Sequence, residues 1–402
     1  MYPIDFIRKQ YPALQKGDTV YLDNAAGSQV PQQVVENMVE AMTTMQVNKG
    51  GLYKPSERIT QIKEDVRALT ATFLNTEADN IHFGPNATTL NELLAQAVGR
   101  WLKSGDEIII SALDHHANRD PWRRLALQGI AVKTWETNPP YHTLELPTLE
   151  KLLTPKTKLV CMTAASNALG TLTPVKEVAK IVHEHGAKLM VDSVHYAPHF
   201  LPDVQVMGAD MMTFSPYKVF GPHLGVLYLS DEMRETLNPP RLEFFDKGDT
   251  VNWEPGTQNH EAIHAWGGTF RYFEGLSKEM KLEGTERERW QKLFDAFHEH
   301  ETNLGQKLID GLTNLGATVY GLPTINGRTA TVSVNLHDLS PETVATHLGN
   351  SSVAVANGHY YAYTIMMKTL GLEKRGGAVR ISLLHYSNQD DVNAVLQSLG
   401  SL

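Results

Sequence analysis

The sequence predicts an α/β fold with a mainly parallel central sheet between helices, followed by a smaller C-terminal α/β part. Short apolar runs rich in β-branched residues alternate with longer amphipathic stretches, which is the pattern of parallel strands connected by helices. The chain has 402 residues, of which 42% are hydrophobic and 20% charged. This length and composition are typical of a globular protein with a core large enough to bury an active site.

The first part of the chain contains the strands of the predicted central sheet. The expected strands span residues 107–111, 131–135, 158–166, 188–195, 211–215 and 225–230. Helical patterns precede or separate them at residues 31–45, 56–74, 88–102 and 174–186. The first of these helices begins with Pro31, which suits a first helical turn, and the last ends at Gly186, a common helix end.

The pattern changes scale after residue 261. Two long helices are expected at residues 260–276 and 286–312. Short strands and helices then alternate over residues 330–336, 341–349, 352–358, 363–371, 378–383 and 388–399. We therefore predict a large domain over residues 20–265 and a small domain formed by residues 1–19 together with residues 266–402.

Charge and cysteine content exclude several classes of protein. The net charge of -9 argues against a nucleic-acid partner. Cys161 is the only cysteine, so the chain can form no internal disulfide and no zinc ribbon. The N-terminal residues contain no apolar segment like that of a signal peptide, and no run is long enough to span a bilayer. We expect a cytoplasmic protein without a membrane partner.

Lys218 and Asp192 are the most informative polar residues of the predicted sheet. Lys218 follows the apolar strand 211–215, and a poorly solvated lysine loses proton affinity and can act as a nucleophile. Asp192 ends a strand 218 − 192 = 26 residues earlier, although a helix cap is its simpler interpretation. This spacing is what a pyridoxal phosphate site requires, with a Schiff-base lysine and an aspartate that keeps the pyridine nitrogen protonated.

Other polar residues also follow predicted strands or precede helices. His115 could stack on a cofactor ring, be an ordinary loop histidine or bind a metal, although two adjacent histidines do not easily bind one metal. We therefore expect no metal site. Ala87 and Thr88 begin a helix whose N-terminal N–H groups could bind a phosphate. Asn167 follows the strand 158–166 and could contact a cofactor hydroxyl or a substrate carboxylate.

Two further positions could bind anions. The string EPGTQNHEAI places Thr257 before a helix, which is a second phosphate-type site. Arg380 lies in the otherwise apolar strand AVRISL. Its guanidinium could bind a substrate carboxylate in a bidentate manner, or it could belong to a buried structural ion pair.

Several strings of the sequence, taken together, resemble motifs of a known family. YLDNAAGSQVP, GPNATTL, ASNALGTLTPV, VDSVHYAPH, SPYKVFGPHLG, EPGTQNHEAI and VRISLLHY are similar to motifs of fold-type I, class V aminotransferase-like enzymes of the cysteine desulfurase-like branch. The matching strings cover about residues 20–270 and a C-terminal patch. The resemblance implies a homodimer with its active site at the interface and an amino-acid substrate.

The resemblance also implies roles for individual residues. Lys218 would form the Schiff base, Asp192 would pair with the pyridine nitrogen and His115 would stack on the ring. Arg380 would bind the substrate carboxylate. The remaining cofactor ligands would be His195 and Asn167 at the phenolic oxygen, and Ala87, Thr88, Ser215 and, from a second subunit, Thr257 at the phosphate.

One departure from the family bears on the reaction. Cysteine desulfurases carry a mobile loop cysteine that accepts sulfur, and Tyr361 stands near its expected position here, while Cys161 lies in a predicted core strand. We therefore expect β-elimination of the C–S lyase type. The alternatives are a cysteine desulfurase or selenocysteine lyase with an external sulfur acceptor, an epimerase or aminotransferase, and a non-enzymatic binding protein on a decayed fold.

Overall fold

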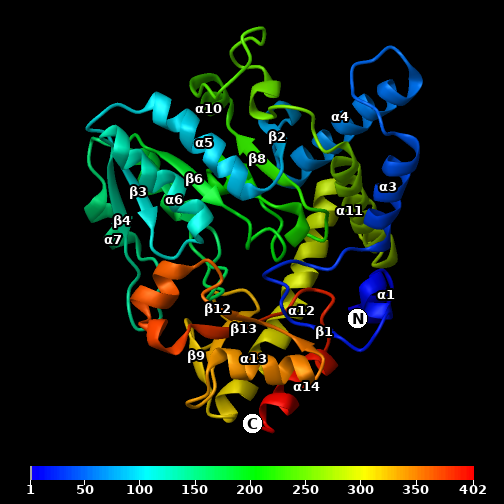
Figure 1. Ribbon diagram of the computed structural model, residues 1–402, viewed down its shortest axis with the longest axis vertical. Coiled ribbons are helices and arrows are strands. Elements are labelled where there is room, and N and C mark those ends of the chain that lie inside the picture. The colour runs from blue at the N-terminus through cyan, green and yellow to red at the C-terminus, as the bar shows by residue number, and fades with distance from the viewer. Residues whose placement is uncertain (1) are drawn as a thin grey trace.

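Seven strands form the central sheet of the protein, which a computed structural model describes over residues 2–402 (Figure 1). In spatial order they are β2 (Ile81–Gly84), β8 (Gly225–Leu229), β7 (Met211–Phe214), β6 (Lys188–Asp192), β5 (Thr157–Thr163), β3 (Glu107–Ser111) and β4 (Ala131–Trp135). The five strands from β7 to β4 run parallel, whereas β8 is antiparallel to both of its neighbours. This arrangement confirms the predicted fold class.

Both faces of the central sheet are covered, as the continuous apolar strands predict. In β5, Leu159 and Cys161 point into the core beneath α5 (Ala87–Trp101), because successive side chains of a strand point to opposite faces. Val160 and Met162 point into the other core, which contains α8 (Val175–Glu184). The strands are therefore buried on both sides, and only the ends of the sheet can hold a site.

Further helices surround this sheet. They are α3 (Gln32–Thr44), α4 (Lys54–Leu74), α6 (Asp120–Arg123), α7 (Leu146–Leu152), α9 (Val204–Met207), α10 (Asp231–Thr236) and α11 (His260–Glu279), with short 3-10 turns at η1 (Ala78–Asn80), η2 (His116–Asn118), η3 (Arg124–Gln128), η4 (Pro216–Lys218) and η5 (Thr250–Trp253). Helices α3, α4 and α11 pack together beside the sheet (Figure 1). The approach of α11 to α3 requires glycine at Gly268, since a Cβ there would lie 2.4 Å from the carbonyl oxygen of Gln33.

A second, antiparallel sheet forms the C-terminal part. Its order is β12 (Ala356–Gly358), β13 (Ala378–Ser382), β10 (Thr331–Asn335) and β9 (Thr318–Tyr320). The associated helices are α12 (Glu286–Asn314), α13 (Pro341–Asn350), α14 (Gln389–Leu399), the π-helical turn η6 (Thr364–Thr369) and the 3-10 turn η7 (Leu372–Arg375). Leu308 of α12, Val332 of β10 and Ile381 of β13 belong to one apolar core.

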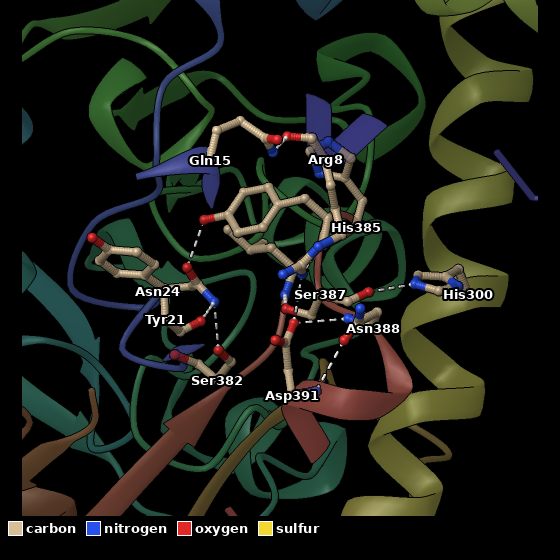
Figure 2. A network of polar contacts seen from close by, with 12 residues as sticks. Arg8, Gln15, Tyr21, Asn24, His300, Ser382, His385, Ser387, Asn388 and Asp391 are labelled. Atoms are coloured by element: carbon tan, nitrogen blue, oxygen red, sulfur yellow. Dashed lines mark hydrogen bonds and ion pairs between the residues drawn. The ribbon is translucent and has the colours of Figure 1, made fainter. Parts of the chain in front are cut away.

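The N-terminal segment lies against this C-terminal part. It contains α1 (Ile4–Lys9), α2 (Pro12–Gln15) and β1 (Val20–Tyr21), and β1 pairs in parallel with β11 (Val353–Ala354). In Figure 2, Arg8 reaches Asp391 and Asn24 reaches Ser382, with nitrogen–oxygen distances of 2.8 Å in both cases. The predicted division into residues 20–265 and residues 1–19 with 266–402 stays a prediction.

The structure differs from the predicted elements mainly where strands are short. β1, β2 and β9 were not predicted, because an apolar run of so few residues has no clear period. The predicted strand 352–358 is two strands, β11 and β12, and the helix expected at 363–371 is the π-helical turn η6. Within residues 2–402, no helix is both long enough and apolar enough to cross a membrane.

Candidate active site

One cavity at the carboxyl edge of the central sheet collects most of the predicted site residues. Strands β5, β6 and β7 lie side by side, so the segments that follow them meet at one edge. Eight predicted residues line the cavity: Ala87, Thr88, His115, Asn167, Asp192, His195, Ser215 and Lys218. An adjoining outer cavity of about 820 Å³ shares Thr88, His115, Asn167 and Lys218 and adds Arg380 and Tyr361.

Lys218 provides a nucleophilic amine in this cavity. It ends the short turn η4 after β7, and its side chain is buried. Burial, together with the nearby charge of Arg380, lowers the pKa of Lys218 to about 8, against the opposing effects of the carboxylates of Asp192 and Asp23. About one tenth of the amine is therefore unprotonated at pH 7, far more than for a lysine with the ordinary pKa of 10.5, so Lys218 can act as a nucleophile.

Asp192 is the buried acid beside this amine. It is the last residue of β6, and one of its carboxylate oxygens accepts a hydrogen bond of 2.9 Å from the backbone N–H of Val194. Burial raises the pKa of Asp192 to about 6, against the opposing effects of that hydrogen bond and of Lys218. A cationic group placed against the carboxylate would favour its ionised form, as the protonated nitrogen of a pyridine ring does.

The N-terminus of α5 forms the phosphate-like end of the cavity. The side chain of Asn86 caps the helix by accepting a hydrogen bond from the backbone N–H of Thr89. The N–H of Ala87 donates to the hydroxyl of Ser215 across a distance of 3.1 Å. Since the first N–H groups of a helix attract anions, Ala87, Thr88 and Ser215 together could hold a phosphate.

His115 and His195 are both neutral rings in the cavity. Burial lowers the pKa of His115 to about 3, with a further contribution from Lys218. Its Nδ1 accepts a hydrogen bond of 3.0 Å from the N–H of Ala117, so its proton lies on Nε2. Burial also holds the pKa of His195 well below the usual range, and His199 and Lys218 act in the same direction.

The polar atoms of the cavity fit pyridoxal phosphate. Nδ1 of His195 and Oδ1 of Asn167 are buried and have no hydrogen-bond partner within the described part of the chain. Buried polar atoms normally have partners. A hydroxyl-bearing ring between Lys218 and Asp192 would supply such partners, and the N-terminus of α5 would receive its phosphate.

Arg380 forms the structural ion pair that was one of its two predicted roles, and its binding of a substrate carboxylate stays a prediction. Its Nη2 donates to Oδ1 of Asp23 at 2.9 Å and its Nη1 donates to the carbonyl of Asn167 at 3.0 Å. The guanidinium carbon lies 4.6 Å from the centre of the Tyr360 ring. Arg380 therefore belongs to a structural ion pair, yet it also lines the outer cavity and carries a buried Nε without a partner among residues 2–402.

Thr257 lies apart from the other predicted residues. It lines two cavities that contain neither Lys218 nor Asp192. The adjacent Glu254 is buried, where it pairs with Lys63 and Arg67 and accepts the backbone N–H of Phe83 at 2.9 Å. This chain therefore does not bring Thr257 to its own Lys218.

The loop that carries Tyr361 contacts the site through its backbone. The carbonyl of Tyr361 accepts a hydrogen bond of 2.8 Å from the N–H of His116, and the carbonyl of Tyr360 accepts one of 2.9 Å from the side chain of Asn167. Both tyrosines have left-handed backbone angles, with φ of 51° and 58°. Tyr361 is 70% exposed, whereas Cys161 is buried in β5 and burial raises the pKa of its thiol.

Sequence reasoning missed three residues that contact the site. Asp23 and Tyr360 hold Arg380, and Thr329 contacts His195. Asp23 lies in YLDNAAGSQVP, one of the strings that carried the family resemblance, so that motif could have drawn attention to it. Thr329 lies in an unremarkable polar turn, and no local signal marks it.

Comparison with known proteins gives a consistent result. Residues 20–395 match the family model described as Aminotransferase class-V. The aminotransferase-like protein FGM3 of Gibberella zeae is 34% identical over 99% of this chain and 98% of its own. A probable cysteine desulfurase of Halalkalibacterium halodurans is 31% identical over 98% of this chain and 96% of its own. The apo structure of a cysteine desulfurase from Thermococcus onnurineus NA1 has a TM-score of 0.90 at 28% identity, covering 100% of this chain and 98% of that one.

Proposed function

We propose that this chain, which belongs to the aminotransferase class-V family, eliminates a β-substituent such as sulfur from an amino acid. Membership of this family makes the protein a pyridoxal-phosphate-dependent enzyme that acts on an amino acid. The predicted family and cofactor are thereby confirmed, and a non-enzymatic role on a decayed fold is not favoured. The type of reaction, the roles of single residues and the dimer are proposals.

The residues of the cavity support a shared first step. Lys218 would hold the cofactor covalently, Asp192 would pair with its ring nitrogen and His115 would stack on the ring. When bound, pyridoxal phosphate supplies an electron sink for negative charge at Cα of the substrate. The amine of Lys218, once freed by the incoming substrate, can take the Cα proton because its pKa of about 8 is close to working pH. Arg380 would orient the substrate carboxylate through its remaining N–H groups.

We propose elimination, and not sulfur transfer to the protein, because the chain has no accessible thiol. Cys161, the only cysteine, is buried in β5, and Tyr361 stands on the loop over the outer cavity. A tyrosine cannot accept sulfur as a persulfide. With cysteine as substrate, the Cα proton and the sulfur would both leave, and the resulting enamine would react with water to give pyruvate and ammonia.

We expect pyruvate as the product when the cofactor-loaded protein is incubated with cysteine, cystine, cysteine sulfinate or selenocysteine. Pyruvate and alanine would be quantified together in each reaction, with Lys218→Ala as the inactive control. Alanine with released sulfur or selenium would contradict elimination and favour a desulfurase or selenocysteine lyase with an external acceptor. If neither product forms, epimerisation or transamination of another amino acid becomes the better hypothesis.

We also propose that two copies of the chain form a dimer with the sites at their interface. Thr257 shares no cavity with Lys218 of its own chain, which favours contact with the cofactor phosphate of a second copy. Large apolar side chains are exposed on α3 and on two loops, which is unusual for a free surface. They are Val35, Val39, Met42, Leu52, Tyr53, Leu242 and Phe244. A cytoplasmic location stays a prediction.

We expect light scattering to give a molar mass of twice the 44.7 kDa of one chain. Leu52→Asp should shift the protein toward the mass of a single copy, because Leu52 is 97% exposed in the isolated chain. Leu127→Asp is the matched control, since Leu127 is also a strongly exposed leucine, at 89%, but belongs to η3 and not to α3 or these loops. A single-copy mass for the unmodified protein would contradict the proposal.

A further inference from the structure

A threonine from the C-terminal part contacts His195, one of the residues that line the cavity around Lys218. The hydroxyl oxygen of Thr329 lies 3.2 Å from Nε2 of His195, and both side chains are buried. Thr329 belongs to the turn that precedes β10, whereas His195 follows β6 of the central sheet. This contact therefore connects the two sheets at the edge of the cavity.

The backbone around Thr329 keeps its hydroxyl in place. The N–H of Thr329 donates to the carbonyl of Gly170, and the N–H of Leu172 donates to the carbonyl of Gly327, each at 2.9 Å. Gly170 has φ of 72°, and a Cβ there would lie 2.6 Å from the carbonyl oxygen of Thr331. The turn is thus pinned directly against the segment that follows Asn167, and the position of the hydroxyl is set by backbone contacts.

The contact between Thr329 and His195 gives the hydroxyl proton an acceptor in only one of the two neutral forms of the His195 ring. A neutral imidazole carries a single N–H, and the nitrogen without a proton accepts a hydrogen bond. Within the part of the chain that is described, Nε2 of His195 is the only side-chain partner of the Thr329 hydroxyl. When the hydroxyl donates its proton to Nε2, Nε2 must be the ring nitrogen without a proton. The ring proton then lies on Nδ1. Nδ1 is the buried ring atom without a partner in this chain.

We propose that Thr329 is a positioning residue that holds His195 with its Nδ1–H available as a donor to the bound cofactor. The inference rests on the proposed role of His195 as the ligand of the phenolic oxygen, and it does not depend on which amino-acid reaction follows. An N–H donor stabilises negative charge on that oxygen. The hydroxyl of Thr329 therefore acts on the cofactor through His195 and without touching it.

The test compares Thr329→Val, which removes the hydroxyl at nearly constant volume, with Thr329→Ser, which retains it. The readout is the visible absorption of the bound cofactor, recorded as a function of pH, together with the cofactor dissociation constant. We expect Thr329→Val to raise the pH midpoint of the absorption change by roughly 1 and to weaken cofactor binding about fivefold, the scale of one hydrogen bond. Thr329→Ser should stay within about twofold of the unmodified protein.

A double-mutant cycle separates positioning from a general loss of structure. In a His195→Phe background, Thr329→Val should no longer move the absorption midpoint, since the hydroxyl acts through the imidazole. An equal shift with and without His195 would overturn the proposal, as would an unchanged midpoint in the single variant Thr329→Val. Thermal unfolding of the cofactor-free variants reports packing losses separately. The absorption readout remains valid even if product analysis rejects elimination.

Discussion

Lys218→Ala is expected to reduce turnover by at least about 10⁴-fold, while the protein keeps its fold. A single general acid–base group contributes about 10²–10⁴-fold, and this amine would also bind the cofactor covalently. The fold should persist because burial already disfavours the charged form of this amine, so its removal costs little stability. Turnover, the cofactor absorption band and thermal unfolding would be measured on the same preparation.

Lys188→Ala provides a matched control for this variant. Lys188 begins β6, the strand that ends at Asp192, so it lies at the opposite edge of the same sheet. Its ammonium pairs with Asp210 and Glu232 near the surface. We expect turnover within about twofold of the unmodified protein, as for most surface substitutions. Retention of the absorption band and of turnover in Lys218→Ala would contradict the assignment of Lys218.

Glu254→Gln is expected to destabilise the protein by about 3–5 kcal/mol, the usual cost of breaking a buried ion pair on one side. The carboxylate faces two buried cations, Lys63 and Arg67, and its distance to Nη1 of Arg67 is 3.0 Å. Without its charge, Lys63 would lose its one ion-pair partner among residues 2–402, and Arg67 would keep only the exposed Glu64. The free energy of unfolding, obtained from denaturant titrations, measures the effect.

Glu64→Gln is the matched control, because Glu64 also pairs with Arg67, at 3.3 Å, but its side chain is 56% exposed. We expect a change within about 0.5 kcal/mol, since exposed ion pairs contribute little. Comparable losses of unfolding free energy in Glu254→Gln and Glu64→Gln would contradict the expectation that the buried ion pair contributes more than the exposed one.

The contribution of Glu254 to the stability of the folded protein should also depend on pH. Burial alone would raise the pKa of Glu254, but the charges of Arg67 and Lys63 hold it at about 2, below its ordinary value of 4.5. A carboxylate with a lowered pKa stabilises the folded state fully above its unfolded pKa, and this contribution is lost as the pH falls toward the folded value. The difference between the unmodified protein and Glu254→Gln should therefore shrink between pH 4.5 and pH 2.

Much of the fold and of the candidate site followed from local patterns. The apolar runs predicted six strands of a mainly parallel sheet, because a strand buried on both faces must be apolar throughout, and five of these six strands run parallel. Lys218, Asp192 and Asn167 could then be placed at one edge, since the ends of neighbouring parallel strands meet there. The buried cation in an apolar run was visible from the sequence, and so was the lack of a second thiol.

What only the tertiary structure decided are the contacts between segments far apart in the chain. Arg380 pairs with Asp23 across 357 residues, and Thr329 meets His195 across 134 residues. Thr257 does not line the cavity around Lys218. Its segment is instead held by the buried Glu254, which contacts α4 and β2. Periodicity and spacing report which face or end a residue occupies. They do not report its partner, because a partner is chosen by the packing of whole elements against one another.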